Sequence, residues 1–147
     1  NLSSEDLKSN IEEAILNKKN FCYETNFNSS PLYWPTIFKQ KEYRIELTFF
    51  CLDSIDIAKE RVRIRVENGG HFVPDHEIEE RYNLGFKHLN ENWKFFDTIH
   101  LFETSKYDCE PKHILTIERN DLIVLVEFPE YLKHLIPNIA ERINYKQ

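Results

Sequence analysis

The sequence of 147 residues predicts an α/β fold in a single domain. Segments with the apolar spacing of helices alternate with segments that have the alternation, or the continuous apolar run, of strands. The segment 43–52 begins with alternation and ends in a continuous apolar run, which is typical of a strand buried on both faces in a largely parallel sheet. We therefore expect this strand in the interior of the sheet.

The first part of the chain predicts two helices and two strands. Ser3 or Ser4 can cap the first helix, and Pro31 has the fixed φ angle that favours the first turn of the second. In chain order, the expected elements are a helix to about Lys19, a strand over 21–25, a helix to about Lys41 and the strand over 43–52.

The second part predicts a pair of helices, three strands and a final helix. Asp53 or Ser54 can cap a helix that ends at Asn68-Gly69-Gly70. The elements expected after it are a helix from Pro74 or Asp75 to about Asn92, a strand over 95–103, a hairpin of 113–118 with 122–128, and a helix from Pro129 to about Tyr145 that Pro137 interrupts.

Composition excludes several classes of protein. The chain has 25 acidic and 19 basic residues, a net charge of −6, so we expect no nucleic-acid partner. The longest apolar runs are far shorter than the roughly 20 residues that span a bilayer, and the first residues do not form a signal peptide, so we expect no membrane contact and a cytoplasmic location. The three cysteines have no metal-binding spacing, so we expect no metal site built from them.

Arginines on the two helices around the Gly-Gly pair are the first candidate site. Arg61 and Arg65 are four residues apart and share a helix face, where like charges repel unless an anion lies between them. With Arg81 across the turn, they have the chemistry of a clamp for a transferring phosphoryl group. The alternative is ordinary surface ion pairing, because Arg63 lies four residues before Glu67 and three after Glu60.

The segment Gly69-Gly70-His71 is a candidate hinge between the two helices. The chain has only three glycines, so a Gly-Gly pair implies a backbone demand such as a positive φ or the close approach of a ligand. His71 alone is weak support for chemistry, since histidine is more often a packing or capping residue.

Glu24, Thr25 and Asn26 are the second candidate site, for binding of a substrate. They follow a strand expected in a parallel sheet, and such sheets bind ligands at the carboxyl ends of their strands. Carboxylate, hydroxyl and amide groups at this place can bond the hydroxyls of a substrate. The alternative is that Thr25 or Asn26 only caps the helix that follows.

The order and spacing of these motifs resemble those of the zeta-toxin-like P-loop kinases. The similar residues are Phe49-Phe50-Cys51-Leu52-Asp53-Ser54, Ala58, Arg61-Val62, Arg65-Val66, Gly69-Gly70-His71, Val73-Pro74 and Arg81-Tyr82, with Glu24-Thr25 before them and Glu103-Thr104-Ser105 after them. The resemblance covers about residues 15 to 118. It implies a three-layer, mostly parallel P-loop kinase-like sheet with a helical lid over 54–92, a C-terminal hairpin and an incomplete N-terminus.

The resemblance also implies an activity. Kinases of this family, which includes toxins of toxin–antitoxin systems, transfer the γ-phosphate of ATP to a sugar hydroxyl, and UDP-N-acetylglucosamine is the substrate of the toxins proper. ATP and Mg²⁺ would be the cofactors of the intact protein. Arg61, Arg65 and Arg81 would stabilise the transferring phosphoryl group, Glu24 and Thr25 would hold the acceptor, and the lid would turn at Gly69 and Gly70.

The sequence departs from the family in one important respect. It has no GxxxxGK[ST] motif, so the Walker A lysine and its neighbouring hydroxyl are absent, and we expect this chain alone to be inactive. We expect that this segment was removed or left out, that another chain supplies it, or that the two strands beside it have closed the gap in the sheet. Two alternatives to a kinase remain: a non-catalytic module that binds a nucleotide or a partner protein, and an antitoxin-like or self-associating partner that docks through sheet edges.

Overall fold

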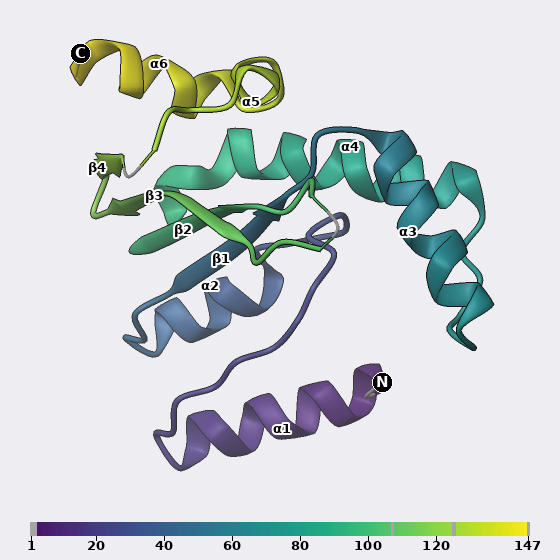
Figure 1. Cartoon of the computed structure of the whole chain (residues 1–147). Helices are drawn as coiled ribbons and strands as arrows, with labels where there is room; N and C mark the ends of the chain where they lie inside the picture. The colour runs from purple at the N-terminus through teal and green to yellow at the C-terminus, as the bar shows by residue number, and fades with distance from the viewer. Residues whose placement is uncertain (1–2, 107, 125, 147) are drawn as a thin grey trace.

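Four strands form one open, mixed sheet in the order β1-β2-β3-β4, and the fold is α/β (Figure 1). The computed structural model describes residues 3–106, 108–124 and 126–146. The strands span Glu46–Cys51, Thr98–Glu103, Lys112–Glu118 and Asp121–Val124. β1 pairs in parallel with β2, whereas β2–β3 and β3–β4 are antiparallel. The prediction of a mostly parallel sheet is therefore wrong, because only one of these three pairings is parallel.

The predicted C-terminal hairpin is confirmed. Its turn consists of Arg119 and Asn120, whose φ angles of +49° and +70° give the left-handed pair of a type I′ turn. β4 ends at Val124 and not at Phe128, and residue 125 of the predicted strand lies outside the described residues.

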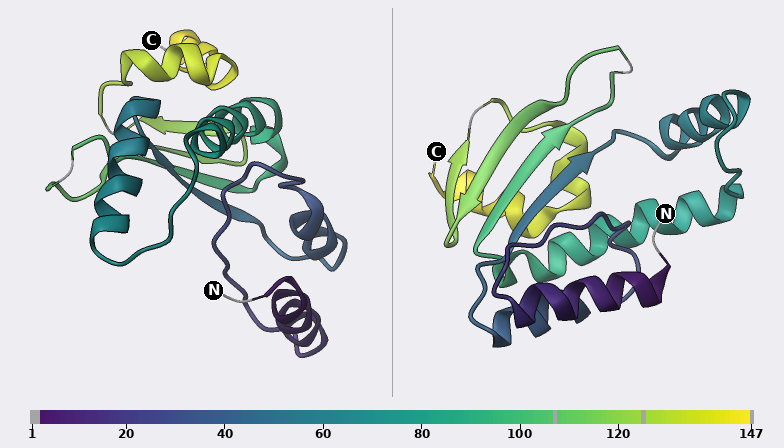
Figure 2. Two further views of the ribbon diagram at one scale, coloured as in Figure 1. Left: turned by 90° about the vertical axis from the view of Figure 1, so that its right-hand side faces the viewer. Right: turned by 90° about the horizontal axis from the view of Figure 1, so that it is seen from below.

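Helices pack on one face of the sheet and at its β1 side (Figure 2). They span Ser4–Leu16 (α1), Tyr33–Gln40 (α2), Ile55–Glu67 (α3), Asp75–Asn92 (α4), Glu130–Leu135 (α5) and Pro137–Lys146 (α6), with a 3₁₀ turn over Trp93–Phe95. The core lies between the sheet and α4, α5 and α6. It includes Leu101 and Leu115 from the strands, Leu89 from α4 and Ile139 from α6, each fully buried. The expected break at Pro137 is confirmed, since α6 begins there.

The opposite face of the sheet carries exposed side chains. Phe50 of β1 is 58% exposed and Ile123 of β4 is 52% exposed. Thr48 is exposed as well, and the rings of His100 and Phe102 between these two strands are only partly buried. Within the described residues, no helix covers this face, so the arrangement has two layers and not the three that the resemblance implies.

Two expected strands differ in the structure. Residues 21–25 form an irregular loop between α1 and α2, and the rings of Phe21 and Phe38 stack 6.0 Å apart. The strand expected in the sheet interior is β1, which lies at the border of the sheet. β-Propensity is a weak guide where no neighbouring strand is available to pair, because much of it reflects packing against neighbours.

α3 and the N-terminal half of α4 form an arm that extends beyond the sheet (Figures 1 and 2). None of the residues of α3 is buried, whereas α4 buries Phe86 and Leu89 toward its C-terminal end. Lys59 Nζ joins the two helices through an ion pair with Glu79 Oε1 at 2.6 Å. These two helices confirm the helical elements expected around the Gly-Gly pair.

Candidate functional site

The loops that follow β1 and β2 are tied to each other at the carboxyl edge of the parallel pair. Thr104 donates to the Cys51 carbonyl through its backbone N–H and through its Oγ1, each at 2.9 Å. The Asp53 N–H donates to Ser105 Oγ at 2.9 Å. Burial and the nearby Glu103 carboxylate raise the pKa of the Cys51 thiol, so this sulfur stays protonated and is a poor nucleophile.

Arg61 points from α3 to this edge. Its guanidinium donates to the Thr104 carbonyl oxygen and, at 3.3 Å, to Thr104 Oγ1. Arg65, one helical turn further on, is exposed, and within the described residues its guanidinium has no hydrogen bond or ion pair. The structure therefore brings one of the three predicted arginines to the strand ends and leaves a second cation without a partner on the following turn.

The other arginines of the arm are paired. Arg63 contacts the carboxylates of Glu60 and Glu67, so the ion-pair alternative is correct for this residue. These carboxylates raise the pKa of Arg63, chiefly through the hydrogen bond to Glu60. Arg81 is paired with Glu77 Oε1 at 2.6 Å, four residues earlier on α4. The three candidate arginines thus have three different environments and are not gathered in one cluster.

Gly69 and Gly70 terminate α3. Gly69 has a φ of +88°. Its N–H donates to the Val66 carbonyl at 3.0 Å, and the Gly70 N–H donates to the Arg65 carbonyl at 2.7 Å, which together make a Schellman motif. A Cβ at Gly70 would lie 2.8 Å from that Arg65 oxygen. The expected backbone demand is therefore confirmed, and its cause is the end of the helix. His71 follows in an exposed position.

Glu24, Thr25 and Asn26 lie on the loop before α2, which corrects their expected place at the end of a strand. Thr25 Oγ1 accepts a bond from the Phe27 N–H at 3.0 Å, so it stabilises a local turn and caps no helix. The side chains of Glu24 and Asn26 are exposed and have no hydrogen bond within the described residues.

The ring of Phe27 anchors this loop to the sheet. It lies 6.1 Å from the ring of Phe49 of β1 in an edge-on arrangement. A Cβ at Gly85 of α4 would meet the Asn26 carbonyl oxygen at 3.5 Å. Gly85 therefore lies where α4 packs closely against this loop.

A group that sequence analysis missed surrounds Glu103 at the end of β2. Tyr131 of α5 donates its hydroxyl to Glu103 Oε2, and the Ser105 N–H donates to Oε1 at 2.5 Å. Burial, followed by the hydrogen bond to Glu103, raises the pKa of Tyr131. The Glu-Thr-Ser run was a visible signal in the sequence, but its partner Tyr131 lies 28 residues away and no local pattern joins them.

Tyr82 of α4 contacts the end of β1 at the same edge of the sheet. Its hydroxyl donates to the Leu52 carbonyl at 2.8 Å. Burial, and then the negative charge of Asp53, raises its pKa to about 12. Both tyrosines consequently stay neutral hydrogen-bond donors at physiological pH.

The free energy of unfolding is expected to fall as the pH rises from about 10 to about 12 because of Tyr82. In this range the unfolded chain has lost the phenolic proton that the folded chain still holds, so rising pH favours unfolding. Urea unfolding followed by fluorescence at a series of pH values measures the slope. The Tyr82→Phe variant should show a shallower fall than the wild type, and an equal slope in the two proteins would contradict this assignment.

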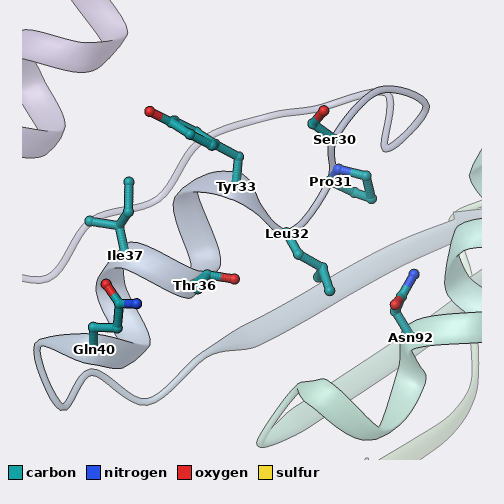
Figure 3. Close-up of a pocket in the computed structure, with 8 residues that line it drawn as sticks. All are labelled: Ser30, Pro31, Leu32, Tyr33, Thr36, Ile37, Gln40 and Asn92. Atoms are coloured by element: carbon teal, nitrogen blue, oxygen red, sulfur yellow. The ribbon is translucent and has the colours of Figure 1, made fainter.

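A pocket of about 550 Å³ lies on α2 (Figure 3). Its lining is uncharged: Ser30, Pro31, Leu32, Tyr33, Thr36, Ile37, Gln40 and Asn92. Asn92 and Arg81 are eleven residues apart on α4, which separates them by roughly 17 Å along the helix. This pocket therefore has neither the charge nor the position of a phosphate site.

Three comparisons with known proteins were made. None found a match: no protein-family model, no curated protein and no solved structure is similar to this chain. Within the residues that the structure describes, no three His, Cys, Asp or Glu side chains are grouped to hold a metal ion. None of the described helices is both long enough and apolar enough to cross a membrane. The chemistry of the strand edge is therefore the basis for assigning a function.

Proposed function

We propose that this chain forms the lid and acceptor part of an ATP-dependent small-molecule phosphotransferase. The observation that carries the proposal is the position of Arg61, whose guanidinium reaches from the arm to the loop after β2. The carboxyl edge of parallel strands is where α/β proteins bind ligands. The resemblance to zeta-toxin-like kinases supports the same reaction.

The exposed cation of Arg65 makes this edge attractive to a polyphosphate. Arg61 and Arg65 lie one turn apart on α3, about 6 Å along the helix axis, and repel each other in the absence of an anion. A polyphosphate between them would replace this repulsion with charge-assisted hydrogen bonds. Closure of the arm would also exclude water, so that the γ-phosphoryl group passes to a sugar hydroxyl, as in UDP-N-acetylglucosamine, and not to water.

The residues present fit the phosphates of ATP better than they fit a metal ion. Guanidinium groups bind phosphate oxygens, and Arg61 and Arg65 supply two of them. The sequence has no Walker A lysine, and Mg²⁺ finds no preformed group of three ligands in the described parts of the chain. We therefore assign no step to the metal. Arg81 would have to exchange its contact with Glu77 for a phosphate in order to take part.

Removal of Arg65 tests the proposal. We expect Arg65→Ala to weaken the binding of inorganic tripolyphosphate by about tenfold, because a hydrogen bond to a charged group contributes about 1.5 kcal/mol or more. Arg63→Ala is the matched control, since it removes an arginine from the same helix whose charge Glu60 and Glu67 already balance. Isothermal titration calorimetry measures both. Equal affinities of the two variants would contradict a phosphate site on this helix.

A non-catalytic module that binds nucleotides or phosphates is the second candidate. It is favoured by the pairing of Arg81 with Glu77 and by Glu24, whose exposed side chain on the loop before α2 has no hydrogen bond within the described residues. ATP labelled at the γ-phosphate, incubated with UDP-N-acetylglucosamine, distinguishes the two. Transfer of the label supports the kinase. The module is supported if the protein binds ATP through Arg65 but no form of the protein transfers the label.

A further inference from the structure

The backbone of β1 has an unpaired outer edge. The Ile45 carbonyl accepts a bond from the Thr98 N–H at 3.3 Å, and the Cys51 carbonyl accepts one from the Thr104 N–H at 2.9 Å. In a parallel strand, every second residue directs its N–H and C=O groups to the same neighbouring strand. The main-chain groups of the odd-numbered residues of β1 therefore point to β2. The N–H and C=O groups of Glu46, Thr48 and Phe50 therefore point outward. Within the described residues they have no backbone partner.

A row of rings on the uncovered face of the sheet ends at this edge. The ring of His113 stacks on that of Phe102 at 4.6 Å with an angle of 13°, and Phe102 lies 5.6 Å from Phe50. Phe50 is the outermost member and is 58% exposed. One further side chain beside Phe50 would continue the row, as cross-strand pairs do in sheets.

Charge is unevenly distributed along the same face. At the amino end of β1, Glu46 and Glu118 flank Thr98, and Asp121 lies opposite Glu118. Arg44 contacts the carboxylates of Glu46 and Glu118, each at 3.4 Å. In this group of contacts, three negative charges therefore stand against one positive charge. A strand added beside β1 would thus meet an acidic residue at one end and an aromatic residue at the other.

We propose that β1 binds an extended segment of a partner protein as an additional strand of the sheet. The partner segment carries a basic residue opposite Glu46, a small or β-branched residue opposite Thr48 and an aromatic residue opposite Phe50. Its alternate residues are apolar, because they cover Leu47 and Phe49 on the inner face, which are only partly buried. Main-chain bonds to the outer edge supply affinity, and the side chains supply specificity.

A second copy of the chain is a poorer occupant. Antiparallel pairing of two β1 strands centred on Thr48 would place Glu46 opposite Phe50 of the copy, so neither the acidic end nor the row of rings gains a matching partner. This proposal is independent of the phosphotransferase, because it rests on the border of the sheet and not on the arginines of the arm.

Peptide binding tests the proposal. The probe is a synthetic peptide with the order lysine, valine, threonine, valine, phenylalanine, valine, and a second probe has the reversed order, so that both strand directions are covered. A control peptide of the same composition has the order valine, valine, lysine, threonine, phenylalanine, valine, so that in no register can its lysine, threonine and phenylalanine all lie on one face of the added strand. We expect one probe to bind and, on binding, to slow amide hydrogen exchange at Thr48 and Phe50 by about tenfold or more, with little change at Phe49.

Two variants provide the matched controls. Thr48→Pro removes an outward N–H without loss of a bond to β2, so the fold should persist and the probe should bind about tenfold more weakly. Phe50→Ser should weaken binding by about threefold, and Ile123→Ser, at the other border of the same face, should not change it. Equal binding of probe and control peptides would overturn the proposal. Exchange at Thr48 and Phe50 that slows with protein concentration alone would overturn it in favour of a second copy.

Discussion

Replacement of Arg61 by alanine is expected to weaken the binding of inorganic tripolyphosphate by about 100-fold. Hydrogen bonds to charged groups contribute about 1.5–3 kcal/mol each, and 2.7 kcal/mol corresponds to a factor of about 100 in the dissociation constant. Arg61 is partly buried and is held at the strand edge by Thr104, whereas Arg65 is exposed. We therefore expect a larger effect at Arg61 than at Arg65.

Arg61→Lys separates charge from geometry. Lysine keeps the positive charge but lacks the planar fork that bonds two phosphate oxygens at once, so this variant should recover only part of the lost affinity. Calorimetric titration at two salt concentrations gives the affinities, and urea unfolding shows whether the loss of the Thr104 contact changes stability. An Arg61→Ala variant that binds tripolyphosphate within twofold of the wild type would contradict the proposed phosphate site.

Leu101→Ala is expected to lower the free energy of unfolding by about 3 kcal/mol. Leu101 lies in the middle of β2, is fully buried, and belongs to the core between the sheet and its helices. Its truncation removes apolar contacts and leaves a cavity that the surrounding strands, paired on both sides of β2, are poorly able to close.

Ile123→Ala is the matched control for this measurement. Ile123 lies in β4 on the uncovered face and is 52% exposed, so its truncation should cost less than about 0.5 kcal/mol. The buried Trp93 provides a fluorescence signal for urea unfolding of both variants. If Leu101→Ala lowers the free energy of unfolding by less than about 1 kcal/mol, the core does not lie where the structure places it.

Local signals in the sequence predicted most helices well. Ser3 and Ser54 are the residues whose side chains cap α1 and α3, and both lie at the expected places. Gly69 marks the end of α3 as expected, because its positive φ is a demand of the helix terminus itself. These features depend on groups within one or two turns of chain, which is why a sequence reveals them.

The predicted strands were less successful because strands depend on partners. Residues 21–25 have β-prone side chains, yet they pair with no strand in the described structure, and Phe21 packs instead against Phe38 of α2. The apolar end of segment 43–52 predicts burial on both faces, but Phe50 is 58% exposed. Whether a strand lies inside a sheet or at its border depends on segments distant in the sequence.

Local patterns in the sequence predict most of the helices, the serine caps of α1 and α3, the hairpin and the several arginines on the arm. Contacts between distant parts of the chain select which of those arginines reaches the strand edge, because Arg61 meets Thr104 through the parallel pairing of β1 with β2. Such contacts also place Tyr131 against Glu103, and they leave the outer edge of β1 without a paired strand among the described residues. The two kinds of feature differ in range, because caps and turns form between neighbouring residues, whereas sheet order and the contact of Arg61 with Thr104 join residues far apart in the chain.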